Sequence, residues 1–294
     1  MTVSIYCVTF ILIVENIHMA NVLKTEKQIA VISALAEGSS IRSIERMTGI
    51  NRNTIMNLGV RVGKGCAKLM DEKMRNLTCQ NLQFDELWGF IGKKQKQVNQ
   101  FDDITKGDVW TFCALDADTK LIPSYRVGKR TAEVTQNFVK DVASRIKNRP
   151  QITTDGFAKY VEAIEQSFGS EVDYAMLVKN YSNDGGQINH ERKYSASPMV
   201  FAQKTLVCGK PKASLVSTSF VERANGTTRQ HMKRLAHLTY AFSKKLENFE
   251  AAVALHFAYY NFVRTHGTLK MTPAMAAGVE SSFMTVGDLV EATK

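Results

Sequence analysis

The chain has 294 residues, of which 44% are hydrophobic and 22% are charged. This composition is typical of a folded globular protein and excludes a disordered chain or a collagen-like repeat. Lys and Arg number 38 against 28 Asp and Glu, which gives a net charge of +10. That charge favours a polyanionic partner, either nucleic acid or an anionic membrane surface. The length predicts one large domain with a smaller companion.

The first 18 residues stand apart from the rest of the chain. Residues Val3 to Val14 are almost wholly apolar, but a membrane-spanning helix needs about 20 residues and a signal peptide needs a basic start and a cleavage site. Met19 then opens a polar sequence. We expect translation to start at Met19, and residues 1–18 are left out of the predicted fold.

Residues 19–78 are predicted to form a small all-helical domain, because apolar residues recur at intervals of three and four and proline is absent. Within it, Ser40 to Leu58 has the layout of a helix-turn-helix, with Gly49 in the turn and Asn51 as the cap of the second helix. Glu45 departs from that motif, which usually has a small residue there. A structural or dimerising helical hairpin is the alternative.

The start of the second helix carries side chains suited to phosphates and base edges. They are Arg52, Asn53 and Thr54. Basic residues also outnumber acidic residues across this domain, so we expect it to bind DNA.

Residues 79–264 are predicted to form an α/β domain, because the hydrophobic period changes to that of strands. Predicted strands cover Phe84–Gly92, Val109–Ala117, Lys120–Gly128, Gln151–Asp155 and Tyr174–Val178. Predicted helices cover Thr131–Lys147, Phe157–Phe168, Thr218–Leu235 and Lys244–Arg264. Residues 179–214 show no clear helix and are expected to be a basic loop or flap. Residues 265–294 are expected to be a carboxyl-terminal tail.

Three acidic residues are predicted to meet at the sheet: Asp85 on the first strand, Asp155 at the end of the fourth, and Glu222 on the helix after the flap. Carboxylates bridging two divalent cations can activate an oxygen nucleophile and stabilise the charge of phosphodiester chemistry. Oxygen ligands without cysteine favour Mg²⁺ or Mn²⁺, so we expect two such ions.

Each of these acids also has a structural interpretation. Asp155 suits the N-cap of the next helix, and Ser219 with Glu222 matches a capping box. Against the capping box, Glu222, Gly226, Arg229 and Lys233 would share one helix face, with Arg229 and Lys233 placed to hold DNA. A solvated surface helix remains the alternative for this basic region.

Other residues that bind metals are less well placed. Glu86 adjoins Asp85 and competes for the metal, whereas Asp116 and Asp118 suit a turn. The histidines form no pair at zinc-binding spacing on one helix, although His231 lies near the Glu222 face. The five cysteines are widely spaced without a C-x-x-C pair, so a disulfide framework and a cysteine zinc site are not predicted, and a reducing cytoplasmic compartment fits best.

Several stretches together resemble the DDE superfamily of bacterial insertion-sequence transposases. FDELWGFIGKKQ resembles the strand of the first aspartate and TTDGFAKY that of the second. TSFVERANGTTRQHMKRL, with FSKKLENFEAAVALHFAYYNFVRTHGTLKMTPAMAAG, resembles the glutamate helix and carboxyl-terminal signature. The resemblance covers most of the chain. Some relatives carry an amino-terminal cysteine zinc finger that this chain lacks.

The resemblance implies a ribonuclease-H-like fold, a mixed sheet flanked by helices, preceded here by the helix-turn-helix domain. It implies Asp85, Asp155 and Glu222 as the metal-binding triad, with Arg229 and Lys233 holding donor or target DNA. The expected function is metal-dependent cleavage and strand transfer at the ends of an insertion sequence, by a nucleoid-associated homo-oligomer that binds double-stranded DNA and no membrane. The alternatives are a DNA-binding regulator or inactive remnant, and a structure-selective nuclease without strand transfer.

Overall fold

The computed structural model describes residues 23–181, 199–236 and 240–294. The apolar segment at residues 3–14, Met19, and the part of the predicted flap between residues 182 and 198 lie outside these ranges. Within them, no helix has the length and apolarity needed to cross a membrane. Cys66, Cys79 and Cys113 are buried free thiols, and Cys208 is an exposed one.

Three helices open the described chain: α2 (Thr25–Ala36), α3 (Ile41–Thr48) and α4 (Arg52–Lys73). Gly49 ends α3 in the left-handed conformation, with a φ of 69°, which costs glycine little because it has no Cβ. The Asn51 side chain caps α4 by accepting from the Asn53 backbone N–H at 2.8 Å. Glu45 Oε1 accepts from the Arg52 backbone N–H at 3.0 Å, so the residue that departs from the motif supplies a second cap.

The sheet has six strands in the order β3-β2-β1-β4-β5-β6. The strands are β1 (Asn81–Ile91), β2 (Gly107–Asp116), β3 (Ser124–Gly128), β4 (Gln151–Thr154), β5 (Asp173–Tyr181) and β6 (Met199–Cys208). β1 pairs antiparallel with β2 and parallel with β4, and β4 and β5 are also parallel. A mixed sheet flanked by helices is therefore confirmed, and the order of its first five strands is that of a ribonuclease-H-like sheet.

The period of two along β1 assigns the helices to opposite faces of the sheet. Phe84 packs against Phe138 of α5 (Ala132–Arg145) and Tyr160 of α6 (Lys159–Phe168). The adjacent Gln83 instead meets the start of α7 (Ser219–His231), and Gly89 meets Phe249 of α8 (Leu246–Ala258). Asp85 shares the face of Gln83 and Gly89, as its alternation predicts.

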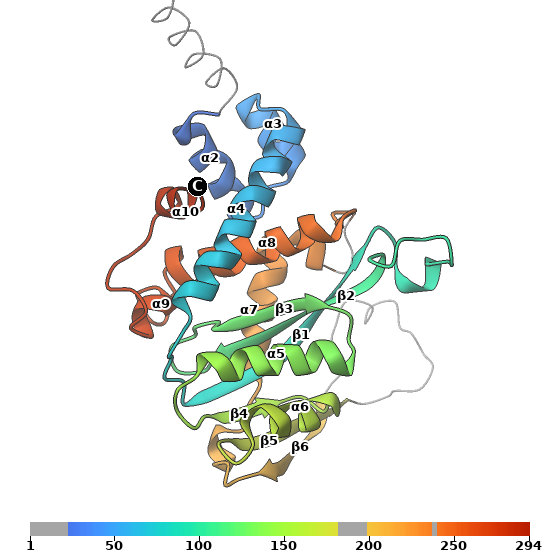
Figure 1. The fold of residues 1–294 in the computed structure, drawn as a ribbon, viewed down its shortest axis with the longest axis vertical. Helices are drawn as coiled ribbons and strands as arrows, with labels where there is room; N and C mark the ends of the chain where they lie inside the picture. The colour runs from blue at the N-terminus through green and yellow to red at the C-terminus, as the bar shows by residue number, and fades with distance from the viewer. Residues whose placement is uncertain (1–22, 182–198, 237–239) are drawn as a thin grey trace, which may run out of the picture.

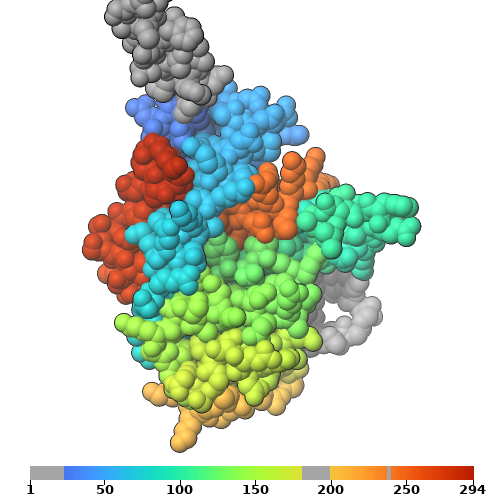
Figure 2. Space-filling model, viewed as in Figure 1, coloured from blue at the N-terminus to red at the C-terminus, as the bar shows by residue number. Residues whose placement is uncertain are grey.

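The helices of the amino-terminal part pack on the rest of the chain (Figure 1). The long helix α4 crosses α8, where a Cβ on Gly63 would lie 2.2 Å from the Ala251 carbonyl oxygen. α9 (Pro273–Ala276) and α10 (Val286–Ala292) follow the predicted domain, and α10 packs against α2 and α4. In Figure 2 the red carboxyl-terminal segment lies against the blue helices. A single large cluster of buried apolar side chains includes residues from both ends of the described chain, from Val31 of α2 to Val290 of α10.

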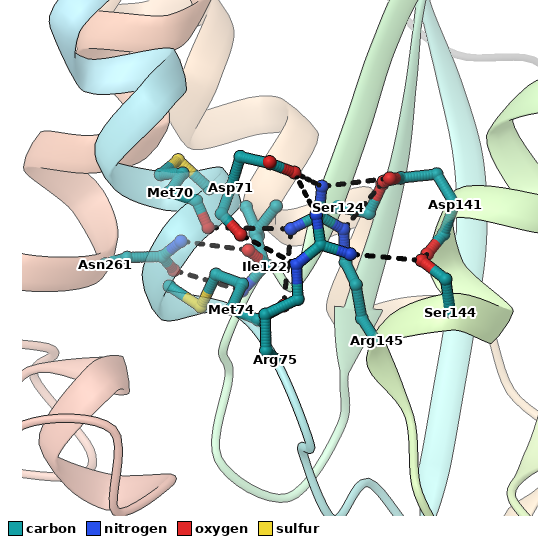
Figure 3. Close-up of polar contacts among 10 residues, drawn as sticks. All are labelled: Met70, Asp71, Met74, Arg75, Ile122, Ser124, Asp141, Ser144, Arg145 and Asn261. Carbon is teal, nitrogen blue, oxygen red and sulfur yellow. Dashed lines mark hydrogen bonds and ion pairs between the residues drawn. The ribbon is translucent and has the colours of Figure 1, made fainter.

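A buried arginine joins α4 to α5 (Figure 3). The Arg145 guanidinium donates to Asp71 Oδ1 on α4 at 2.7 Å and to both carboxylate oxygens of Asp141 on α5. It also donates to the Met70 and Met74 carbonyl oxygens at the end of α4. The guanidinium therefore satisfies the Met74 carbonyl at the helix end and adds a second hydrogen bond to the Met70 carbonyl, which already accepts from the Met74 N–H.

Two of the sequence predictions for this part of the chain are wrong. The predicted flap includes an ordered strand, because β6 pairs antiparallel with β5. β6 is an edge strand with most side chains exposed on both faces, so it lacks the clean alternation that would have revealed it.

The predicted helix 218–235 is also too long, because α7 ends at His231 and Lys233–Leu235 forms a separate 3₁₀ turn. The turn after α2 packs at this point, where a Cβ on Gly38 would lie 2.5 Å from the His231 carbonyl oxygen. The helix that follows, α8, continues as a π-helix over Tyr259–Val263.

Candidate functional site

Asp85 and Asp155 lie beside each other because the register of the parallel strands brings them together. Gln83 of β1 pairs with Thr153 of β4, and each aspartate lies two residues further along its chain. Asp85, Glu86 and Asp155 each have one carboxylate oxygen that lies within 4.8 Å of the corresponding oxygen of the other two. Two of the three predicted acids therefore converge, and the neighbouring Glu86 joins them.

Asp85 is the most enclosed member of the predicted triad. Its Oδ1 accepts from the Glu86 backbone N–H at 2.9 Å, and its Oδ2 accepts from the Asn225 side-chain amide at 2.7 Å. Burial raises the pKa of Asp85 to about 6, and the Asp155 and Glu222 carboxylates add to the rise while the two hydrogen bonds oppose it. The ionised carboxylate is therefore destabilised here, and a bound cation would relieve that cost.

Glu86 faces the other side of β1, toward α6. The Arg130 guanidinium donates to Glu86 Oε2 through two nitrogens, at 2.8 and 3.1 Å. Burial raises the pKa of Glu86 to about 7, although the Tyr160 hydroxyl and Arg130 oppose the rise. The sequence places Glu86 only as a competitor for the metal. In the structure it is a buried, arginine-bound neighbour of both aspartates.

Asp155 is the open side of this cluster, with a side chain that is 42% exposed. Its Oδ1 accepts from the Phe157 backbone N–H at 2.9 Å, which forms a turn. The helix begins only at Lys159, with Ala158 as its N-cap residue, so the alternative that Asp155 caps this helix is wrong. Arg130 Nη2 lies 3.8 Å from Asp155 Oδ2 and connects it to Glu86.

Glu222 lies outside the group of carboxylates that meet within 4.8 Å, yet its charge contributes to the raised pKa of Asp85. Glu222 Oε1 forms an ion pair with Lys179 of β5 and accepts from the Thr218 hydroxyl at 2.6 Å. The structure thus places Glu222 near Asp85 but directs its carboxylate toward Lys179.

The interpretation of Ser219 and Glu222 as a capping box is wrong, because that motif is not formed. The N-cap residue of α7 is Thr218, and its side chain makes no capping hydrogen bond. Instead, Gln83 Oε1 of β1 accepts from the Phe220 and Val221 backbone N–H groups at 3.0 and 3.1 Å. A long-range partner therefore takes the capping role, and Glu222 is free of it.

The predicted basic face of α7 is shorter than expected. Arg229 lies on α7 and is partly buried, whereas Lys233 belongs to the following 3₁₀ turn and is exposed. The two residues therefore do not share one continuous helix face with Glu222, because α7 ends between them. At the other end of the molecule, the side chains of Arg52, Asn53 and Thr54 are exposed on the first turn of α4.

Four side chains that position the site are absent from the predicted set. Arg130, Lys179 and Asn225 contact the acids, and Gln83 caps the helix that carries Glu222. Asn225 had a usable signal, since it lies three residues after Glu222 and thus on a neighbouring part of the same helix surface. The others had none, because Gln83, Arg130 and Lys179 reach their partners only through the fold of the sheet.

The donor set fits a hard divalent cation. Asp85, Asp155 and Glu86 offer carboxylate oxygens, and such ligands suit Mg²⁺ or Mn²⁺. Burial is the main cause of the raised pKa of Asp85, and the Asp155 and Glu222 carboxylates add to it, so a cation bound there would be favoured. Glu86 has a competing partner in Arg130, so Asp85 and Asp155 are the better placed ligands.

No family model matches the chain, and no curated protein matches it. A solved structure of piggyBac transposase in a synaptic complex with hairpin DNA is similar at 10% identity and a TM-score of 0.41, covering 94% of this chain and 72% of that one.

The Mos1 transposase paired-end complex with the left transposon end is similar at 13% identity and a TM-score of 0.23. That similarity covers 53% of this chain and 60% of the other. Similarity at this level establishes neither a family nor an activity for this chain.

Proposed function

We propose that this protein is a DNA transposase that cuts the ends of an insertion sequence and joins them to target DNA. The observation that carries the proposal is the meeting of Asp85 and Asp155 across β1 and β4, with Glu222 close enough to act on the charge of Asp85. A regulator with no catalytic function has no need of a carboxylate whose ionised form is destabilised by burial and by neighbouring carboxylates.

In this proposal Asp85 and Asp155 hold divalent metal, and Glu222 completes the set from α7. Bound Mg²⁺ would supply Lewis-acid stabilisation of the phosphate and acidify a bound water. The chain's own residues orient the ligands: Asn225 fixes Asp85, and Gln83 fixes the start of the helix that carries Glu222. Lys179 holds Glu222 by an ion pair, which has to loosen if that carboxylate is to reach a metal at the aspartates.

The amino-terminal helices would recognise the ends of the element. Arg52, Asn53 and Thr54 present exposed side chains at the start of α4, where helix-turn-helix proteins contact base edges and phosphates. Two ends have to be cut together, so the active form would be a homo-oligomer on double-stranded DNA, with Arg229 and Lys233 contacting donor or target DNA.

The test uses the full chain with end-labelled DNA that flanks the coding sequence, in Mg²⁺, in Mn²⁺ or in EDTA. Asp155→Asn and Glu222→Gln are compared with wild type, and Glu72→Gln serves as a control because its side chain is exposed on α4. We expect metal-dependent cuts at the element's ends, lost in both site variants and kept in the control. Products joined to a supplied plasmid would add strand transfer.

DNA binding without cleavage in either metal would refute the proposed enzymatic activity and favour a DNA-binding regulator. Cleavage that survives Asp155→Asn would refute the assignment of Asp155 as a metal ligand. Cleavage without joined products would favour a structure-selective nuclease. Each result is read only for variants whose thermal unfolding matches that of wild type.

A further inference from the structure

Four basic side chains on and beside α7 lie close enough for their charges to act on one another. They come from four segments of the chain: the turn between β2 and β3, the first half of α7, the residue after the π-helix, and the loop before α9. We call this group the basic cluster; its members are Lys120, Arg223, Arg264 and His266.

Contacts with neighbouring residues place two of these side chains. Lys120 Nζ donates to the Ala117 carbonyl oxygen. The Arg264 guanidinium contacts His231 Nε2 on α7. Lys120 Nζ lies 3.5 Å from the ring centroid of Phe220, which is one turn before Arg223 on α7. The Tyr260 hydroxyl donates to the Lys120 carbonyl oxygen at 3.1 Å, and Arg264 follows Tyr260 by four residues. Lys120 has a φ of 62°, an uncommon left-handed conformation for a lysine. The fold therefore holds this turn against both α7 and the π-helix.

The cations of the basic cluster act on one another. Burial lowers the pKa of His266, and Lys120, Arg264 and Arg223 lower it further in that order. Burial likewise lowers the pKa of Lys120; the carboxylates of Asp118 and Asp116 oppose that effect, and Arg223 adds to it. Several positive charges are thus held within reach of one imidazole.

Compensating carboxylates are scarce around the basic cluster. Among the described residues, no carboxylate lies within ion-pair distance of Lys120, Arg223 or Arg264. In the same set, His266 Nδ1 is buried without a hydrogen-bond partner. The hydrogen-bond partners of Lys120 and Arg264 are a backbone carbonyl and an imidazole, so within the described part of the chain no paired carboxylate balances these cations, and an anion that accepts hydrogen bonds would do so.

We propose that the basic cluster binds a phosphate group of the DNA backbone. This inference rests on the proposed function and adds a contact to it. Arg223 directly follows Glu222 on α7, so the two side chains leave the helix about 100° apart. A strand whose phosphate lies at the carboxylates would have another phosphate within reach of the basic cluster. Arginine and lysine together suit a phosphate, because the guanidinium fork and the ammonium both donate to its oxygens.

The test measures binding of the full chain to a labelled duplex over a series of salt concentrations. The variant Lys120→Asn with Arg223→Gln removes two charges, and asparagine tolerates the left-handed backbone of residue 120. Arg223→Lys keeps the charge, and Lys68→Gln is a control at an exposed lysine of α4. Each lost phosphate contact should lower the slope of log K against log salt by about 0.9. We expect the double variant to lose one to two such contacts and roughly tenfold in affinity.

A second arm separates a backbone phosphate from free phosphate. Thermal unfolding is followed in inorganic phosphate without DNA, for wild type and the double variant. The proposal is overturned if millimolar phosphate stabilises wild type and not the double variant while both proteins bind DNA equally well, because that result would indicate a site for free anions. Loss of affinity with the salt slope reduced, and with Mn²⁺ binding to the carboxylates unchanged, would support it.

The outcomes also separate this inference from the proposed function. If wild type cuts the element's ends but the double variant binds DNA with an unchanged salt slope, the basic cluster is not a phosphate site and only this inference fails. If wild type binds neither DNA nor phosphate, both fail. If Arg223→Lys, which keeps the charge, lowers the salt slope as much as the double variant does, the effect is structural and the inference is overturned.

Discussion

Replacing Asp85 by asparagine should stabilise the metal-free protein at alkaline pH. Asp85 is a carboxyl group whose pKa rises from 3.8 to about 6 on folding, chiefly because of burial. At a pH above both values the side chain is ionised in both states, and the folded state carries the cost. Two pK units correspond to about 3 kcal/mol, so Asp85→Asn removes a penalty of that order.

Part of this gain is lost again through hydrogen bonding. Both Asp85 oxygens accept a hydrogen bond, one from the Glu86 backbone N–H and one from Asn225. Asparagine offers only one oxygen, so its amide meets one of these donors, at a cost of about 1 kcal/mol. The expected net stabilisation is about 2 kcal/mol at pH 8.

The pH dependence follows from the sign of the shift. Because the folded pKa is the higher one, the penalty is absent below pH 4, where the carboxyl group is protonated in both states, and grows as the pH rises from about 4 to 6. Urea unfolding in EDTA at pH 5 and pH 8 checks this, and the advantage of Asp85→Asn should be larger at pH 8. Mg²⁺ should then stabilise wild type and not the variant. A variant that is less stable than wild type at pH 8 in EDTA would refute the reasoning.

Three further substitutions test the packing around the site. Arg145→Met leaves Asp141 without its buried cation and should lower the free energy of unfolding by about 3–5 kcal/mol in urea, whereas a loss below 1 kcal/mol would contradict the structure. Gly63→Ala places a Cβ 2.2 Å from a backbone oxygen and should cost about 1–3 kcal/mol or more by thermal unfolding. Ser219→Ala should change the free energy of unfolding by less than about 0.5 kcal/mol, because the Ser219 hydroxyl is exposed and its hydrogen-bond partner is the Ser217 hydroxyl. A cost near 1 kcal/mol would favour the capping-box interpretation.

The parts of the fold that the sequence predicts are those encoded by local patterns. The cap of Asn51 and the left-handed Gly49 follow from residue type alone, and both are present. The alternation that puts Asp85 on the face of Gly89 is also local. Asp155 follows the end of β4, as the sequence predicts, but Asp85 lies within β1 and comes beside it through the register of the two parallel strands.

Errors arose where a distant residue decides the local structure. Ser219 and Glu222 have the spacing of a capping box, but Gln83 lies 137 residues away in sequence from Phe220 and takes the N–H groups that a cap would satisfy. The helix 218–235 has continuous helical periodicity, and contact with the turn at Gly38 accompanies its end at His231. No pattern within either segment contains that information.

The position of Glu222 has a consequence for how the site would work. Lys179 and Asn225 contact the carboxylates directly, whereas Gln83 acts on Glu222 only through the start of α7. Asn225 and Glu222 share α7, so any movement of that helix changes the partner of Asp85 and the position of Glu222 together. α7 is also the element that carries Arg223 of the basic cluster. Under the proposed function, DNA bound along α7 would alter the lysine-bound state of Glu222 without first contacting either aspartate. The assembly of the carboxylates would then be coupled to the presence of substrate.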